Sequence, residues 1–230
     1  WSFAGSGSDR RGRRGIALQM SPAKKGRKVL ITAGPTREHV DPVRYLSNES
    51  SGKMGFEIAR AAVARGDRVT LVCGPVALET PKGVKRIDVL SARDMLKAVR
   101  TEFRDTDMLI MAAAVADWRP AKKLAGKWRK KDQKTEVASL DLVRNPDILQ
   151  TVAKRKGDRL IVGFALETGD GIRRALSKLK RKNADYIVLN DDSVLGSDRA
   201  TVTILGRDGS EVRLENKTKR AVAKVLAALK

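Results

Sequence analysis

Short, strongly apolar segments alternate with amphipathic segments along most of this chain, and this alternation limits the folds that it can adopt. A continuously apolar segment such as 107–117 is typical of a strand that is covered on both faces. The amphipathic segments between such strands carry apolar residues at helical spacing. The strand-like segments read KVLITAG, RVTLVCG, DMLIMAAAVAD, RLIVGFALET and DYIVLND. Strands separated by helices predict an α/β fold with a doubly wound, mostly parallel, Rossmann-like sheet, whose ligand crevice lies at the carboxyl ends of the strands.

The ends of these elements carry local signals. Ser91 with Asp94 predicts a capping box at the start of one helix, and Asn145 before Pro146 predicts the N-cap of another. Near the end of the chain, an Asp-Gly turn between the alternating segments of residues 201–214 predicts a β-hairpin, which a final helix follows.

Length and composition set the expected domain organisation. With 230 residues and 41% apolar content, the chain can bury one large core. We expect residues 28–230 to form a single domain. Residues 1–27 are rich in Gly, Ser and Arg and lack periodicity, so we expect a basic flexible tail or linker there. The single Cys73 excludes an internal disulfide, and the apolar runs are far shorter than the roughly 20 residues of a membrane helix. These features predict a cytoplasmic protein.

The net charge of +21 comes almost entirely from three local clusters. Residues 1–28 hold eight Lys or Arg and one acid, residues 119–134 hold eight and one, and residues 171–183 hold six and none. Such clusters suit a triphosphate and a phosphorylated substrate, although a basic domain can also bind nucleic acid. With three Trp, two Tyr and four Phe, the chain lacks an aromatic-rich strand motif for base stacking, so nucleic acid is the less favoured partner.

The stretch YLSNESSGKMG follows the first predicted strand and looks like a phosphate-binding loop. It fails the Walker A pattern, because Ser47 and Met54 occupy the positions that need Gly and Ser or Thr. Its backbone N–H groups at the start of a helix could still bind a nucleotide phosphate. A Ser-Gly cap on an amphipathic helix is an equally good interpretation. The residues of this candidate anion cradle are Ser50, Ser51, Gly52, Lys53 and Gly55.

Taken together, several motifs closely resemble the phosphopantothenoylcysteine synthetase family, the phosphopantothenate–cysteine ligases of coenzyme A biosynthesis. The likeness runs from about Lys28 to about Lys230. In order, the motifs are TAGPTREHVDPVRYLSNESSGKMG, AAAVADWRP, KWRKKD, LVRNPDIL, GFALET and NDD. In many bacteria this domain is fused behind a flavin-dependent decarboxylase, so a separate or fused decarboxylase is an implied partner.

The resemblance implies a ligase that joins 4'-phosphopantothenate to L-cysteine through an acyl-nucleotidylate. The nucleoside triphosphate is usually CTP in the bacterial enzymes, with ATP as the alternative, and Mg²⁺ is the expected metal. The family is commonly dimeric, with the site near the subunit interface. A basic nucleotide- or nucleic-acid-binding protein of the same fold that lacks catalysis is the competing hypothesis.

The resemblance also assigns roles to individual residues. Asn48 matches the asparagine that holds the substrate carboxylate and the acyl-nucleotidylate, and Lys127 matches a flap lysine that contacts the triphosphate. Lys130 belongs to the same flap, where Arg129 replaces a lysine. Arg44 is expected to bind the substrate phosphate. From the residues alone, Asn48 could be a turn residue, Arg44 a dimer contact and the flap a solvated basic loop.

The remaining candidates lie on the nucleotide side of the expected site. Ala113 and Ala114 are small enough to let the substrate approach the backbone at a strand end. Asp117 could bind ribose or Mg²⁺, and Phe164 matches a position that lines the nucleobase pocket, although a surface acid and a core Phe fit the sequence as well. Lys182 and Asn190 complete this set.

Overall fold

The computed structural model describes residues 26–130, 136–166, 171–190 and 198–230, so almost all of the tail expected at 1–27 lies outside the described residues. In these ranges an eight-stranded sheet has the order β12-β11-β10-β9-β6-β1-β4-β5. Its strands are β1 (Lys28–Ala33), β4 (Arg68–Cys73), β5 (Val84–Asp88), β6 (Met108–Met111), β9 (Leu160–Leu166), β10 (Tyr186–Asn190), β11 (Arg199–Gly206) and β12 (Glu211–Thr218).

The first six of these strands in chain order pair in parallel, and β11 and β12 form an antiparallel hairpin that adds to β10. The predicted α/β fold and the hairpin are therefore confirmed. Gly209 in the hairpin turn has φ +84°, a backbone conformation that glycine adopts without strain. The charged segment of β5 was not predicted as a strand.

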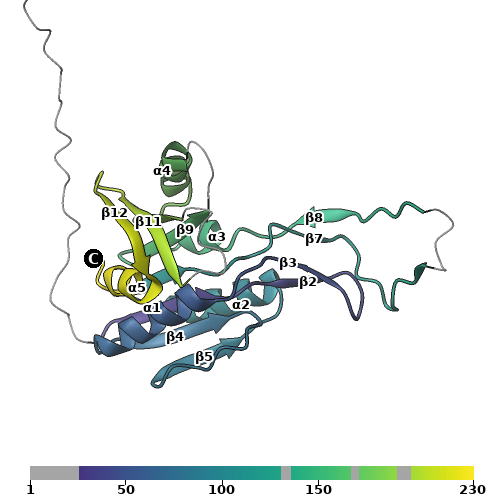
Figure 1. The fold of residues 1–230 in the computed structure, drawn as a ribbon, viewed down its shortest axis with the longest axis horizontal. Helices are drawn as coiled ribbons and strands as arrows, with labels where there is room; N and C mark the ends of the chain where they lie inside the picture. The colour runs from purple at the N-terminus through teal and green to yellow at the C-terminus, as the bar shows by residue number, and fades with distance from the viewer. Residues whose placement is uncertain (1–25, 131–135, 167–170, 191–197) are drawn as a thin grey trace, which may run out of the picture.

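Helices cover both faces of the sheet. One face packs against α1 (Lys53–Ala64) and α5 (Lys219–Ala227), which lie side by side (Figure 1). The other face packs against α2 (Ala92–Glu102), α3 (Ile148–Ala153) and α4 (Gly171–Arg181), with the short 3-10 helix η1 (Phe103–Asp105) after α2. No helix in the described part of the chain combines the length and the apolar character needed to cross a membrane.

The capping signals have mixed outcomes. The predicted capping box of Ser91 and Asp94 is confirmed at the start of α2. The prediction that Asn145 caps the next helix is wrong, because Asp147 is the N-cap of α3 and its side chain accepts a hydrogen bond from the Gln150 N–H. Asn145 instead donates from Nδ2 to the Ala116 carbonyl at 2.8 Å and ties the approach to α3 to the end of β6.

The connections reverse direction at the centre of the sheet. From β1 the chain passes through α1 to β4 on one side, whereas from β6 it passes through α3 to β9 on the other side. The carboxyl ends of β1 and β6 therefore flank the switch point at which open α/β sheets bind their ligands.

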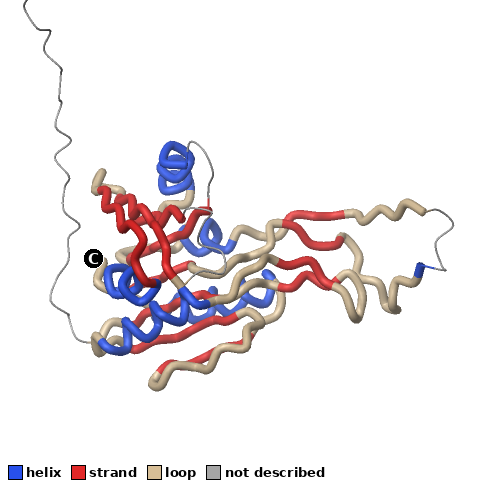
Figure 2. Tube along the Cα trace, in the orientation of Figure 1, coloured by secondary structure: helices blue, strands red, loops and turns tan. Residues whose placement is uncertain are grey.

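A long arm extends away from the sheet (Figures 1 and 2). It contains two antiparallel ribbons, one formed by β2 (Arg37–His39) with β3 (Tyr45–Ser47) and the other by β7 (Trp118–Pro120) with β8 (Leu142–Arg144). These ribbons and the loops that they carry hold Arg44, Lys127 and Lys130.

Close packing between α1 and β1 fixes the entry to the switch point. A Cβ atom added at Gly55 would lie 2.5 Å from the Ala33 Cβ and 3.1 Å from the Thr32 carbonyl oxygen. We expect Gly55→Ala to lower the free energy of unfolding by about 1–3 kcal/mol, because the helix must move off the strand to make room for the methyl group. Urea denaturation followed by circular dichroism measures this change.

Gly126→Ala is the matched control, since nothing lies within 4 Å of the added Cβ at that position. Its stability should stay within about 0.5 kcal/mol of the wild type. Equal effects of the two substitutions would contradict the packing role of Gly55.

Candidate active site

A set of hydrogen bonds joins the segments that follow β1 and β6 at the switch point. The Ala114 N–H donates to the Gly34 carbonyl at 2.9 Å, and the Ala114 carbonyl accepts from the Thr36 N–H at 3.3 Å. The same carbonyl accepts from Asn48 Nδ2 at 3.0 Å, and the Asn48 side chain is exposed. The structure thus brings Asn48 and Ala114, which are 66 residues apart, into direct contact.

Side chains from β1 and from the loop that follows it stabilise this junction. The buried Thr32 hydroxyl oxygen accepts from the Ala113 N–H at 3.1 Å, and the Thr36 hydroxyl oxygen accepts from the Ala116 N–H at 3.0 Å. The small side chains of residues 112–114 are partly exposed at this junction. A ligand could therefore approach the backbone closely here, as the alanine run predicts.

A cavity of about 680 Å³ opens beside this junction, at the carboxyl ends of β6 and β9. Four of the predicted site residues line it, namely Ala113, Asp117, Phe164 and Lys182. Its wall also includes the start of α3, from Pro146 to Gln150, and Lys178 of α4, which were not predicted as site residues. The NPDIL motif carried the signal for the α3 wall, but we interpreted it only as a helix start.

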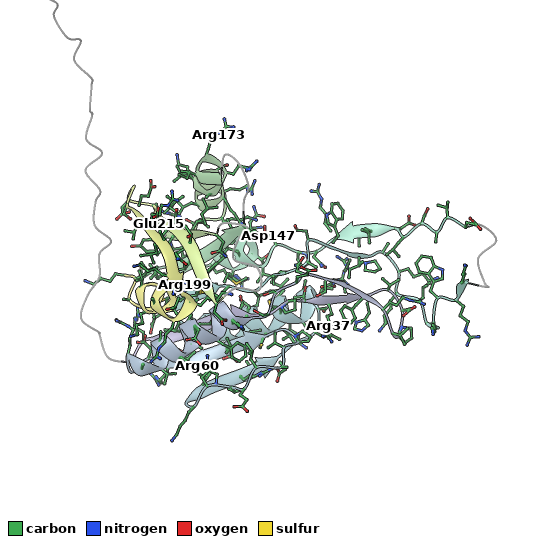
Figure 3. All side chains as sticks on the ribbon, viewed as in Figure 1. Arg37, Arg60, Asp147, Arg173, Arg199 and Glu215 are labelled. Atoms are coloured by element: carbon green, nitrogen blue, oxygen red, sulfur yellow. The ribbon has the colours of Figure 1, made fainter. Side chains whose placement is uncertain are left out.

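The cavity contains charges of both signs. Lys182 forms an ion pair with Asp147, and Lys178 donates from Nζ to the Phe164 carbonyl at 3.0 Å. Burial lowers the pKa of Lys182, and the charge of Asp117 works in the opposite direction. Asp147 lies near the root of the arm, whereas Arg173 on the other side of α4 projects away from the sheet (Figure 3). An anionic ligand could therefore replace Asp147 as the partner of Lys182.

One carboxylate in the cavity suits a magnesium ion that arrives with a nucleotide. Mg²⁺ is usually held by one or two carboxylates together with substrate phosphates. Asp117 meets this requirement, and the described residues contain no group of three or more His, Cys, Asp or Glu that would form a metal cage.

The candidate cradle lies on the other face of the sheet, at the start of α1. Gly52 is the N-cap with φ +75°, and neither a capping side chain nor an acid in the first turn occupies this helix end. Gly52 and Gly55 are buried, and Lys53 pairs with Asp198 through an Nζ to Oδ1 distance of 2.7 Å. None of the five cradle residues lines the cavity, so their role in nucleotide binding stays a prediction.

Asn190 ends β10, the strand next to β9. Its Oδ1 atom is buried and has no hydrogen-bond partner among the described residues. An unpaired acceptor of this kind favours a ligand donor, because leaving a buried polar atom unpaired is unfavourable. The Asp191 and Asp192 of the NDD motif lie outside the described residues.

The predicted flap residues sit on the arm and do not line the cavity. Lys127 and Lys130 are exposed, as is Arg44. Arg44 donates from Nη1 to the Trp128 carbonyl at 2.7 Å and to Asp41 Oδ2 at 2.5 Å. Within this single chain, Arg44 is therefore close to the flap and is not brought into the cavity.

Asp41, which we did not predict as a site residue, connects the two halves of the arm. Its carboxylate accepts hydrogen bonds from the N–H groups of Val43, Arg44 and Trp128 at 2.7, 2.8 and 3.0 Å. The next residue is Pro42, so an Asp-Pro turn was the available sequence signal. Because Trp128 follows Lys127 directly, Asp41 fixes where the flap begins.

The electrostatics of Asp41 follow from these contacts. Burial alone would raise its pKa, but the three backbone donors and the Arg44 guanidinium outweigh burial and lower the pKa from 3.8 to about 2. The carboxylate therefore stays charged at neutral pH and holds the arm in place.

Comparison with known proteins identifies relatives for nearly the whole described domain. The family model of the DNA/pantothenate metabolism flavoprotein C-terminal domain matches residues 24–229. The coenzyme A biosynthesis bifunctional protein CoaBC of Vibrio cholerae is 48% identical over 189 residues, which are 80% of this chain and 47% of that protein. CoaBC of Escherichia coli K12 is 46% identical over 189 residues, which are again 80% of this chain and 47% of that protein.

A solved structure of a relative has a similar fold. The crystal structure of the C-terminal domain of CoaBC superimposes with a TM-score of 0.76 and 42% sequence identity, and the match covers 90% of this chain and 94% of that domain. The chain spans about half the length of the curated relatives that it matches.

The lowered pKa of Asp41 predicts a pH dependence of stability. A carboxylate whose pKa is lower in the folded state stabilises the fold above its unfolded pKa, and this stabilisation is lost as the pH falls from about 3.8 to about 2. We expect Asp41→Asn to be less stable at pH 6 and to lose less further stability across this window. Urea midpoints measured from pH 6 to pH 2 test this.

Asp158→Asn, at an exposed position outside the arm, is the matched control and should follow the wild-type curve. Parallel curves for Asp41→Asn and the wild type would show that Asp41 does not carry the pH dependence.

Proposed function

The chain belongs to the family of the DNA/pantothenate metabolism flavoprotein C-terminal domain, and from this membership we propose that it is a phosphopantothenate–cysteine ligase of coenzyme A biosynthesis. It would join 4'-phosphopantothenate to L-cysteine and convert CTP to CMP and pyrophosphate. The observation that carries the proposal is the contact between Asn48 and Ala114 at the switch point, beside a cavity that contains two lysines and a suitable acid.

The proposed reaction has two steps. A carboxylate oxygen of phosphopantothenate attacks the α-phosphorus of CTP, and pyrophosphate leaves as the bond to its bridging oxygen breaks. The cysteine nitrogen then attacks the acyl carbon and loses a proton, and CMP leaves with the oxygen that came from the carboxylate. Both reactants of the first step are anions, so the site must neutralise and align them.

Asn48 is proposed to act on the acyl group. Its Nδ2 already donates to the Ala114 carbonyl at 3.0 Å, so the amide is held at the junction with a donor ready for an acyl oxygen. An amide donates without acting as a competing nucleophile. Ala113 and Ala114 leave room for the substrate beside it.

The cavity is proposed to hold the nucleotide. Its volume of about 680 Å³ suits a nucleoside triphosphate. Phe164 would contact the base, and Lys182 would exchange Asp147 for a phosphate. Asp117 would hold Mg²⁺, which supplies charge neutralisation for the triphosphate. Asn190 and the cradle at residues 50–55 are proposed as further nucleotide contacts, with CTP as the preferred nucleotide and ATP as the alternative.

The arm supports a homodimer in which the site lies near the subunit interface. Several large apolar side chains on the arm are exposed, whereas such groups are usually buried. They include Val43 at 59%, Trp118 at 45%, Tyr45 at 42% and Leu142 at 42% exposure. A second copy that covered them would bring Lys127, Lys130 and Arg44 of one arm toward the other subunit, where they could bind the triphosphate and the substrate phosphate.

The relatives are bifunctional proteins, and this chain matches about half of their length. We therefore propose a flavin-dependent decarboxylase, either fused or separate, as the partner that consumes the product, and the cytoplasm as the location of both reactions.

The proposal is tested by incubating the purified protein with 4'-phosphopantothenate, cysteine, Mg²⁺ and each nucleoside triphosphate in turn. We expect pyrophosphate and phosphopantothenoylcysteine to form, fastest with CTP. Product with ATP and not with CTP would correct only the choice of nucleotide. No turnover with any nucleotide, together with nucleotide binding, would favour a binding protein without catalysis.

Substitutions at Asn48 and Lys127 should fail in different ways. Asn48→Asp should bind nucleotide but impair the cysteine-dependent step, because a carboxylate cannot donate to the acyl oxygen and repels phosphates. Lys127→Gln should slow pyrophosphate release on the order of 10²-fold or more, because it removes a charge directed at the triphosphate. Mass spectrometry of quenched reactions reports the acyl-nucleotidylate directly.

Lys123→Gln, on the same arm and also exposed, is the matched control and should react at the wild-type rate. Unimpaired turnover by Asn48→Asp, or equal losses for Lys123→Gln and Lys127→Gln, would exclude the proposed roles.

A further inference from the structure

A second basic region lies at the opposite end of the sheet from the proposed active site. It forms a groove between α2 and the segment that joins α3 to β9, at the amino ends of β6 and β9. Two adjoining cavities of about 500 and 280 Å³ make up this α2–α3 groove, and both are lined by Arg100 and Arg104. Arg93 and Lys97 line the smaller cavity, and Lys154, Arg155 and Arg159 line the larger one.

The cations converge because of helical spacing. Positions 93, 97, 100 and 104 follow one another at intervals of four, three and four residues, which places them on one face of α2 and η1. Positions 154, 155 and 159 meet this face from the other side of the groove. Five basic side chains therefore line the larger cavity, and Arg93 and Lys97 continue the basic surface along α2.

The acids of α2 and η1 are engaged elsewhere, and the exposed Asp158 of the other wall lines neither cavity. Asp94 accepts hydrogen bonds from Ser91 in the capping box, Glu102 pairs with Lys85 at 2.9 Å, and Asp105 pairs with Lys28. Within the described ranges, no Asp or Glu lines either cavity, and neither Arg100 nor Arg104 forms an ion pair. Residues 92–105 carry four Lys or Arg and three Asp or Glu, so a charge count along α2 and η1 does not reveal the groove.

Arg159 makes the groove rigid. It donates from Nε to the Phe103 carbonyl at 3.0 Å, from Nη2 to the Arg104 carbonyl at 2.9 Å and from Nη1 to the Lys156 carbonyl at 3.1 Å. Its guanidinium also covers the Phe103 ring, with 5.1 Å from the Cζ atom to the ring centroid. The two walls are thus fixed before a ligand arrives, which reduces the entropy lost on binding.

From these observations we propose that the α2–α3 groove is a binding site for a small anion that carries several phosphate groups, distinct from the nucleotide cavity. Converging arginines bind phosphate oxygens in pairs, and the volume fits a polyphosphate chain. Single-stranded nucleic acid fits less well, because its binding relies on exposed aromatic rings and Phe103 is only 4% exposed beneath Arg159.

The test is a titration of the ¹⁵N-labelled full chain with sodium tripolyphosphate, followed by amide NMR spectra at about 0.15 M salt, where weak non-specific attraction is screened. We expect saturable shifts at residues 100–105 and 151–159. Shifts at residues 113–117 and 164 report binding to the nucleotide cavity separately, so the outcome is independent of the proposed ligase activity.

The double variant Arg100→Glu/Arg104→Glu should bind about tenfold more weakly or worse at the groove and leave the cavity shifts unchanged. Arg220→Glu/Lys224→Glu changes the same charge at an equally spaced, exposed pair on α5 and should leave the groove affinity unchanged. Shifts that do not saturate, or equal losses in both variants, would overturn the proposal. Tighter binding of a short single-stranded oligonucleotide than of tripolyphosphate at the groove would overturn it in favour of nucleic acid.

Discussion

The junction between the carboxyl ends of β1 and β6 is the constraint on which the rest of the structure depends. Parallel strands whose connections leave in opposite directions open a crevice there, and the backbone of Ala114 closes its floor through bonds to Gly34 and Thr36. The side chain of Asn48 shares the same carbonyl oxygen. This bond holds Asn48, from the loop before α1, against the segment that follows β6.

Charge is used differently in three parts of the molecule. At the cavity, Lys182 is buried and paired with Asp147, and an anionic ligand could replace Asp147 in this ion pair. On the arm, the buried Asp41 holds backbone N–H groups and Arg44, which orders the flap without touching the cavity. In the α2–α3 groove, the cations face one another without acids among the described lining residues. In this groove the attraction for an anion is therefore not offset by a neighbouring acid.

Much of the fold could be predicted because burial on both faces produces continuous apolar strands, as in β6, and because the Asp-Gly turn of the β11–β12 hairpin has a defined geometry. The short charged strand β5 and the arm ribbons could not be predicted, because their pairing depends on distant partners and not on local periodicity. Asn145 was misread for a similar reason: its side chain bonds to Ala116, 29 residues away. For the site, the structure places Asp117, Phe164 and Lys182, three residues named from the sequence, beside one cavity, whereas Asp41 and the α2–α3 groove arise from contacts that sequence spacing does not show.

In the proposed reaction, a carboxylate is activated at this junction by transfer of a nucleotidyl group. Phosphopantothenate labelled with ¹⁸O in its carboxylate tests this step most directly. If the carboxylate attacks the α-phosphorus, one labelled oxygen must appear in the nucleoside monophosphate after cysteine has displaced it, and mass spectrometry should find the label there and none in pyrophosphate. Label in inorganic phosphate, with release of a nucleoside diphosphate, would show activation through an acyl phosphate and would contradict the account.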